Sequence, residues 1–122
     1  MLNDLAKKIN VAAQKKGFWR DMYTSLSALE AYGTYADTIK ATKDAFIAQK
    51  ITLVHAELSE AIEAMRNNMY GTEKKSTFED EIGDAIMRLL DITAQMNIDI
   101  EAQIAWKMDY NLSRAQKHGK EF

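Results

Sequence analysis

The sequence contains no cysteine and no proline, and only 5 of its 122 residues are glycine. Without cysteine, neither a disulfide framework nor a thiolate metal site can form, so the chain suits a reducing compartment. Proline and glycine are the residues that most often interrupt helices, and their scarcity favours an all-α protein. The length fits a single domain, residues 1–122, with a hydrophobic core of its own.

Long apolar runs and an excess of one charge are also missing. No segment approaches the roughly 18 apolar residues of a membrane span, and charges are spread throughout residues 1–16, where a signal peptide would need an apolar stretch. The 16 basic and 18 acidic residues leave a net charge of -2, which gives no general attraction to nucleic acid or to acidic membranes. We therefore expect a soluble cytoplasmic protein with neither of these partners.

Helical patterns begin at the N-terminus. The first predicted helix covers about residues 3–16, with Asn3 as its N-cap and Gly17 as its terminator. Residues 20–43 have a less regular pattern, which predicts one or two short helices broken near Gly33.

Three further helices are predicted in the rest of the chain. The first covers about residues 46–67 and is followed by a polar loop. Ser76 and Glu79 can form a capping box for the next helix. The last predicted helix begins at Asp99, a plausible N-cap, and continues to about residue 117.

Apolar residues recur on the two middle helices at the spacing of a single helical face. The first stripe consists of Ile47, Ile51, Val54, Leu58, Ile62 and Met65. The second consists of Ile82, Ile86, Leu89, Thr93 and Met96. We expect both stripes to be buried in the core.

Beside each stripe, two acids stand three residues apart. The chain reads ELSEAI from Glu57 and EIGDAI from Glu81, so that Glu60 aligns with Asp84. At about 100° per residue, both acid pairs have the same angular offset from their stripes. If the two helices pack antiparallel, the four carboxylates can therefore face each other.

Four carboxylates gathered at about 5 Å repel by roughly 3 kcal/mol per pair at an effective dielectric of ~20. Basic side chains can cancel this repulsion, or the pairs can point into water on different sides, as most single motifs of this kind do. Two matched pairs favour instead a hard divalent cation with oxygen ligands, and Mg²⁺ fits best, with Mn²⁺ as a substitute. A di-iron site is not expected, because neither His55 nor His118 completes a Glu-x-x-His motif.

Arg88 lies on the same face as the second acid pair, one turn beyond Asp84 and followed by Asp91. Its guanidinium can pair with either of these two carboxylates or contact a phosphate. The sequence leaves these alternatives open.

The last predicted helix carries basic and amide side chains on one face. Four of them recur at intervals of 4, 3 and 4, and two lysines lie near the end: Lys107, Asn111, Arg114 and His118, with Lys117 and Lys120. Such a face is usually solvated surface. Beside a metal–carboxylate site, however, it can hold phosphate oxygens that the metal does not reach. The two sets of residues together predict a polyphosphate substrate.

These motifs resemble those of the MazG-like, all-α nucleoside triphosphate pyrophosphohydrolases. Two acid pairs separated by 20 residues are similar to that family's signature, and the tail KMDYNLSRAQKHGKEF, from Lys107, is similar to that of its compact members. The segment KGFW, residues 16–19, resembles the one before the first motif helix. The resemblance covers residues 1–19 loosely and residues 46–122 well, but residues 20–43 are longer than the connection expected there.

The resemblance implies a compact bundle of four to five helices that assembles as a dimer or a dimer of dimers. It implies Mg²⁺-dependent cleavage of a nucleoside triphosphate between the α and β phosphates, giving a nucleoside monophosphate and pyrophosphate, as in house-keeping of the nucleotide pool. The metal ligands would be Glu57, Glu60, Glu81 and Asp84. Glu60 would also orient or deprotonate the attacking water.

Substrate binding is assigned by the same resemblance. The phosphates and sugar would contact the basic and amide side chains of the last helix, namely Lys107, Asn111, Arg114, Lys117 and Lys120. Phe18 and Trp19 would stack on the base, although a Phe–Trp pair between helices is more often part of a core. The alternative to an enzyme is a non-catalytic helical module that binds nucleotides or another protein.

Overall fold

The computed structural model describes residues 1–33 and 35–114, which form five α-helices and no strand. The all-α class is therefore confirmed. In chain order the helices are α1 (Leu2–Lys15), α2 (Arg20–Ala31), α3 (Ala36–Arg66), α4 (Phe78–Gln95) and α5 (Ile100–Leu112). Within the described residues, no helix combines the length and the apolar character needed to cross a membrane.

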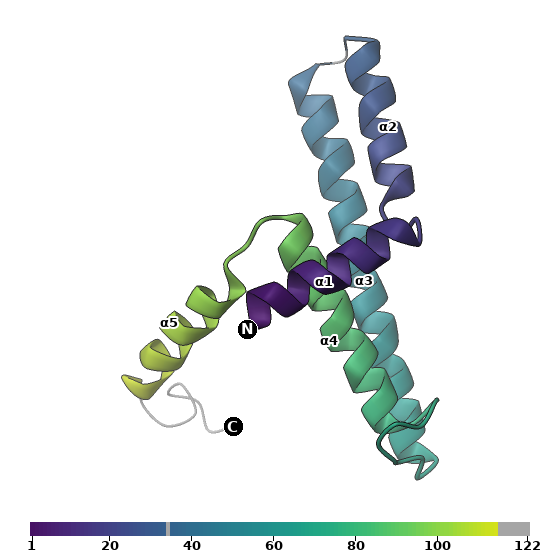
Figure 1. Ribbon diagram of the computed structural model, residues 1–122, viewed down its shortest axis with the longest axis vertical. Coiled ribbons are helices and arrows are strands. Elements are labelled where there is room, and N and C mark those ends of the chain that lie inside the picture. Colours follow the sequence, from purple (N-terminus) through teal and green to yellow (C-terminus); the bar gives the residue numbers. More distant parts are fainter. Residues whose placement is uncertain (34, 115–122) are drawn as a thin grey trace.

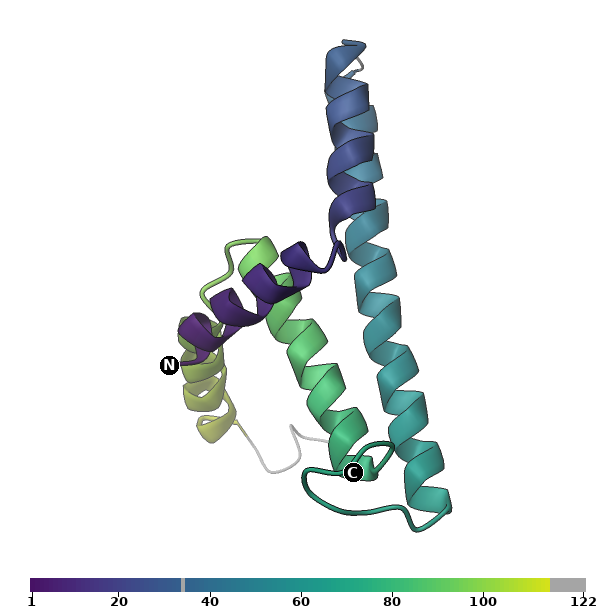
Figure 2. The same cartoon turned by 45° about the vertical axis from the view of Figure 1, so that its right-hand side comes forward.

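The longest helix, α3, is the axis around which the other helices are arranged. Its C-terminal half packs antiparallel to α4, and its N-terminal half forms a projecting hairpin with α2 (Figure 1). Turned by 45°, α3 is seen as one continuous helix from the tip of this hairpin to the loop before α4 (Figure 2). α1 lies across α4 and leads into the hairpin. We call α1, α4 and residues 46–66 the body.

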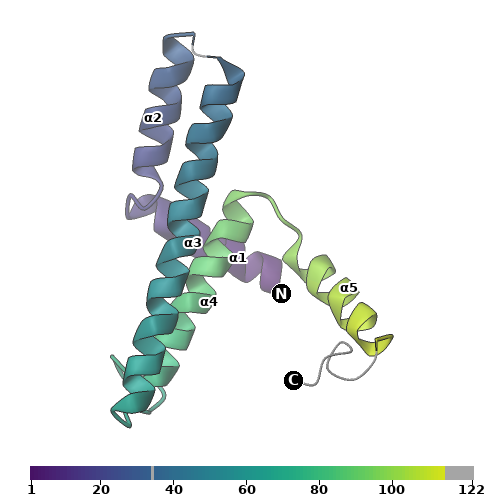
Figure 3. The same ribbon diagram turned by 180° about the vertical axis from the view of Figure 1, so that it is seen from behind.

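α5 lies apart from α3 and α4, as the view from behind shows (Figure 3). It is joined to the start of α1, where the Asn3 side chain accepts a hydrogen bond from the backbone N–H of Ile100 at 3.1 Å and the N-terminal ammonium pairs with Glu101 at 2.7 Å. None of its residues is buried. The arrangement is thus more open than the compact bundle expected from the sequence.

The core lies where α1, α2, α3 and α4 meet. Trp19 is 1% exposed, and its Nε1–H donates to both carboxylate oxygens of Asp91 at 3.0 and 3.1 Å. The ammonium of Lys50 lies 5.1 Å from the centre of the same ring. A buried indole N–H needs such a polar partner, so Trp19 fixes the corner between α1 and α2 to both α3 and α4. The cluster around it consists of Ala13, Met22, Ile47, Val54, Ala85 and Ile92.

The predicted apolar stripes are buried only in part. On α3, Ile47 and Val54 are buried, but the other four members are 43 to 49% exposed. The residues of α3 that are buried nearer its C-terminus are Glu57, Ala61 and Ala64. Small alanine side chains let two helices approach closely, and this turns the larger aliphatic side chains outward.

The second stripe is also turned partly away from the core. Thr93 is buried and Ile82 is half-buried, but Ile86, Leu89 and Met96 are exposed. Because the exposed members have matching offsets on two antiparallel helices, they share one side of the pair. We call this surface the outer apolar face: Ile51, Leu58, Ile62 and Met65 on α3, with Ile86 and Leu89 on α4.

Two predicted caps are corrected by the structure. Asn3 lies inside α1, whose N-cap is Met1 without a side-chain hydrogen bond, and the Asn3 side chain serves the start of α5 instead. The N-cap of α4 is Thr77, which accepts from the backbone N–H of Asp80, while the Asp80 carboxylate accepts from that of Ser76. The predicted pairing of Ser76 with Glu79 is therefore wrong by one residue.

Of the other predicted helix boundaries, the end of α1 and the start of α5 agree with the structure, whereas the start of α3 and the end of α5 do not. Gly17, with a φ of +80°, ends α1 as predicted, since a left-handed backbone favours glycine. Asp99 caps α5, accepting from the backbone N–H of Ala102 at 3.0 Å. α3 begins at Ala36 rather than near residue 46, because no breaker separates the two positions. α5 ends at Leu112, before the predicted end at residue 117.

Candidate functional site

The two acid pairs meet between α3 and α4. One carboxylate oxygen each from Glu57, Glu81 and Asp84 can be chosen so that all three lie within 4.8 Å of one another. The antiparallel packing of α3 on α4 produces this arrangement, as the matching offsets of the two pairs predicted. The fourth acid, Glu60, is outside this group, but its carboxyl interacts with that of Glu81.

The crowding of negative charge is visible at Glu81. The pKa of its carboxyl is raised above the ordinary value of 4.5, first by loss of solvation and then by a hydrogen bond and repulsion from Glu60, with smaller repulsion from Asp80 and Glu57. In this environment a bound proton relieves the repulsion, and a bound metal cation can do the same.

Arg88 provides part of the compensating charge. Its Nε–H donates to Glu57 Oε1 at 2.7 Å, so its acidic partner is on the facing helix and is neither Asp84 nor Asp91, the two acids that the sequence suggested. The Glu57 side chain is only 10% exposed, whereas that of Arg88 is 39% exposed, so the pair lies at the edge of the buried region. Within residues 1–33 and 35–114, no basic side chain forms an ion pair with the other three acids, Glu60, Glu81 and Asp84.

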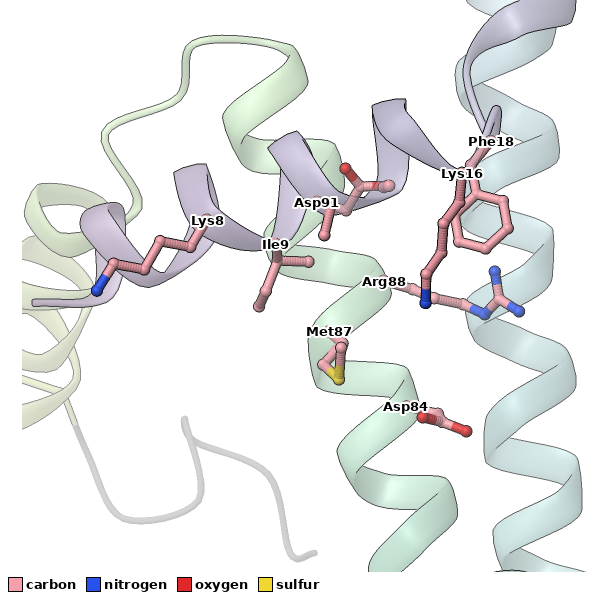
Figure 4. A pocket seen from close by; sticks show the side chains of 10 residues that line it. Lys8, Ile9, Lys16, Phe18, Asp84, Met87, Arg88 and Asp91 are labelled. Atoms are coloured by element: carbon pink, nitrogen blue, oxygen red, sulfur yellow. The ribbon is translucent and has the colours of Figure 1, made fainter.

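A pocket of about 400 Å³ adjoins the carboxylates between α1 and α4, and Asp84 belongs to both (Figure 4). Its apolar lining is Ile9, Ala12, Ala13, Phe18 and Met87, and its polar lining is Lys8, Lys16, Asp84, Arg88 and Asp91. In Figure 4, the side chain of Lys16 extends from the end of α1 toward that of Arg88, which reaches from α4 toward α3, whereas the ammonium of Lys8 points toward the other end of α1. The site thus joins an acidic end to a pocket with cations and apolar surface.

Phe18 and Trp19, the two residues expected to stack on the nucleobase, lie in different environments. Phe18 is 54% exposed and lines the pocket, so its ring is accessible for stacking. Trp19 is in the core, as a Phe–Trp pair between helices more often is, and offers no free face to a ligand.

The basic face of the last helix is not brought to the carboxylates within one chain. Lys107 and Asn111 are on α5, which points away from α3 and α4, and Arg114 follows it. The ammonium of Lys107 lies 4.8 Å from the centre of the Tyr110 ring, and the guanidinium carbon of Arg114 lies 5.2 Å from the same centre. The remaining predicted residues of this face lie outside the described residues: Lys117, His118 and Lys120.

One pocket residue, Lys16, was given no role by the sequence, although it is the first residue of the KGFW segment. The signal available in the sequence is its place directly before Gly17, because a glycine terminator turns the chain and leaves the last helical side chains near the corner. That corner becomes part of a site only once α1 is seen to cross α4.

Comparisons of the chain with protein-family models, with curated proteins and with solved structures gave no match. The resemblance to MazG-like enzymes therefore remains one of motifs. A function for this chain rests on the carboxylate group and on the pocket beside it.

Proposed function

We propose that the protein is a Mg²⁺-dependent nucleoside triphosphate pyrophosphohydrolase. The observation that carries this proposal is the meeting of Glu57, Glu81 and Asp84 within 4.8 Å at the edge of a pocket of about 400 Å³. Mg²⁺ binds through few carboxylates and keeps positions for water and for substrate phosphates. Mn²⁺ has similar ligand preferences and is the expected substitute. A pocket of this size is within the range that holds small-molecule ligands.

Each acid has a separate part in the proposed reaction. Glu57, Glu81 and Asp84 hold the metal, which polarises phosphoryl oxygens and makes a bound water more acidic. Glu60 is exposed and next to Glu81, and its carboxylate would orient that water and accept its proton. Asp84 also lines the pocket, so the reacting phosphate would bind at the boundary between the two parts of the site.

The test is to incubate the pure protein with a panel of nucleoside and deoxynucleoside triphosphates and Mg²⁺ and to measure released pyrophosphate. We expect pyrophosphate and a nucleoside monophosphate, and no release when a chelator removes the metal. In ¹⁸O-labelled water, the label should enter the monophosphate, because water attacks the α-phosphorus. Orthophosphate as the primary product, with a diphosphate left behind, would contradict the proposal.

A second candidate is a non-catalytic module that binds nucleotides. The observation in its favour is the position of α5, which leaves the expected phosphate-binding residues away from the carboxylates. The same incubation separates the two candidates, since the module would bind nucleotides in the presence of Mg²⁺ and release no pyrophosphate.

We also propose that the protein is a homo-oligomer, formed through the outer apolar face. Leu58, Ile62 and Ile86 are 43, 49 and 50% exposed there, and large apolar patches on a surface are typical of protein interfaces. Light scattering at micromolar concentration should give at least twice the 13.9 kDa of one chain. Leu58→Glu places a charge in this interface and should reduce the mass to that of one chain. A wild-type mass of 13.9 kDa would contradict the proposal.

The α5 residues can then contribute to the site from a second copy. In one chain, α5 and the carboxylates lie apart, but an oligomer supplies additional α5 helices. The resemblance implies that Lys107, Asn111 and Arg114 bind the phosphates. On the proposed function, they would do so at the carboxylates of a second copy of the chain.

A further inference from the structure

Lys16 is a cation of the pocket, and its ammonium has no protein partner among residues 1–33 and 35–114. Within this described part of the chain, its side chain makes no hydrogen bond and no ion pair, although two acids line the same pocket. One of them, Asp91, already accepts from Trp19 and from the Asn10 amide at 2.8 Å. The other, Asp84, belongs to the carboxylate group. The ammonium of Lys16 is therefore available to a ligand.

Arg88 adds a second cation whose position is fixed. Its Nε–H is bound to Glu57, and the side chain of Lys16 extends toward it (Figure 4). The pair with Glu57 uses one edge of the planar guanidinium and holds the whole group in place. The other donors can then bind oxygens in a defined direction.

The rest of the pocket is suited to a planar apolar group. Ile9, Phe18 and Met87 line it, and the Phe18 ring is exposed. An aromatic ring and a thioether favour stacking on a flat, polarisable ligand such as a nucleobase. Cations, apolar surface and a carboxylate at the boundary thus occur within about 400 Å³.

We propose that Lys16 and Arg88 bind the phosphates of a nucleotide in this pocket, with the base against Phe18. The inference rests on the proposed function and deepens it, because it assigns phosphate binding to α1 and α4 of the same chain. A phosphate placed beside Asp84 is repelled by that carboxylate, and the metal on one side and the two cations on the other remove this repulsion. Lys16 is the more informative residue to change, since Arg88 also compensates the buried Glu57.

The test is calorimetric binding in the presence of Mg²⁺ with two probes. One is inorganic pyrophosphate, and the other is a set of α,β-methylene nucleoside triphosphates, which cannot be split between those phosphates. Lys16→Met should weaken both probes by about tenfold or more, the usual effect of losing a charge-assisted hydrogen bond. Lys15→Met is the matched control: it removes the same charge from the neighbouring exposed position, outside the pocket, and should change affinity by less than about twofold.

Phe18→Ala distinguishes the two parts of the ligand. It should weaken the nucleotide analogues and leave pyrophosphate binding unchanged, because pyrophosphate has no base to stack. Circular dichroism should show the same helix content for all variants. Equal effects of Lys16→Met and Lys15→Met would overturn the inference, and so would a wild-type protein that binds neither probe.

The outcome is separable from that of the proposed function. Lys16-dependent binding without any release of pyrophosphate from true substrates would support the pocket and refute the hydrolase. Turnover that is unaffected by Lys16→Met would support the hydrolase and refute the role of Lys16.

Discussion

The body and α5 differ in how much of their surface the chain itself covers. In the body, α3, α4 and α1 enclose Trp19 at 1% exposure, and the carboxylates are brought together by the same packing. In α5, no residue is buried and Trp106 is 57% exposed. The comparison shows that one chain forms the acidic group by itself, whereas the basic residues of α5 are not brought to that group within one chain.

The largest expected effect concerns the reaction that we propose for the body. Asp84→Asn keeps the shape of the side chain and removes its charge, so pyrophosphate release should fall by roughly 10²–10⁴-fold, as for the loss of a group that assists proton transfer or metal binding. Helix content should be unchanged. Asp44→Asn is the control, because Asp44 is an exposed acid near the start of α3 that pairs with Lys40. Wild-type turnover in Asp84→Asn would exclude this carboxylate as an essential ligand.

The next effect compares the stability of the two regions. Trp19→Ala should lower the free energy of unfolding by about 3–5 kcal/mol, because it leaves a cavity in the core and removes the indole hydrogen bonds to Asp91. Trp106→Ala should change it by less than about 1 kcal/mol, since the ring is exposed and stacks only on Tyr110 within the described residues. Urea denaturation followed by circular dichroism measures both. Similar losses for the two variants would mean that α5 is buried in the assembly.

Mixing two inactive variants tests whether α5 acts on another copy. If Lys107→Met and Asp84→Asn each abolish turnover, hybrid dimers restore one intact site when the two residues come from different chains. After subunit exchange, about a quarter of the wild-type sites should be active for equal mixing into dimers. Turnover is measured before and after exchange at low denaturant. Activity that does not recover would place α5 and the carboxylates of one chain in the same site.

The smallest effect is the pH dependence that Glu81 contributes. Its pKa is raised in the folded protein, so the folded state binds this proton more tightly than the unfolded chain. The resulting stabilisation is complete below the ordinary value of 4.5 and is lost as the pH rises through the folded value. We therefore compare the melting temperatures of the wild type and of Glu81→Gln without Mg²⁺. As the pH rises from 4.5 through the pKa of Glu81 in the folded protein, the wild-type value should decrease relative to that of the variant. Mg²⁺ should make the decrease smaller, because the metal takes the place of the proton.

The helices and the meeting of the acids could be predicted from local pattern. Acids three residues apart, at one offset on two helices, determine which carboxylates meet once the helices pair antiparallel. The rotation of the helices could not be predicted in this way. It depends on Ala61 and Ala64, whose small side chains allow close packing and compete with a larger aliphatic stripe.

Contacts between distant segments were also beyond the sequence pattern. Arg88 was expected to pair within its own helix or to reach a phosphate, but the buried Glu57 on the facing helix is the nearer acid once α3 and α4 pack. The position of α5 is determined by the hydrogen bonds of Asn3 and by the ion pair between the N-terminal ammonium and Glu101. The spacing of residues along a helix does not reveal such partners. Helical spacing identifies a face, and the fold determines what covers it.

The hydrogen bond from Trp19 to Asp91 has an optical consequence. The two tryptophans of the chain are in opposite environments, one enclosed under the Lys50 ammonium and the other in contact with solvent, so their emission should differ in wavelength and in quenching by iodide. In a Trp106→Phe protein, all tryptophan fluorescence comes from the indole that is bonded to a pocket-lining carboxylate. A ligand that enters between α1 and α4 would then be visible as a change of intensity, without a label.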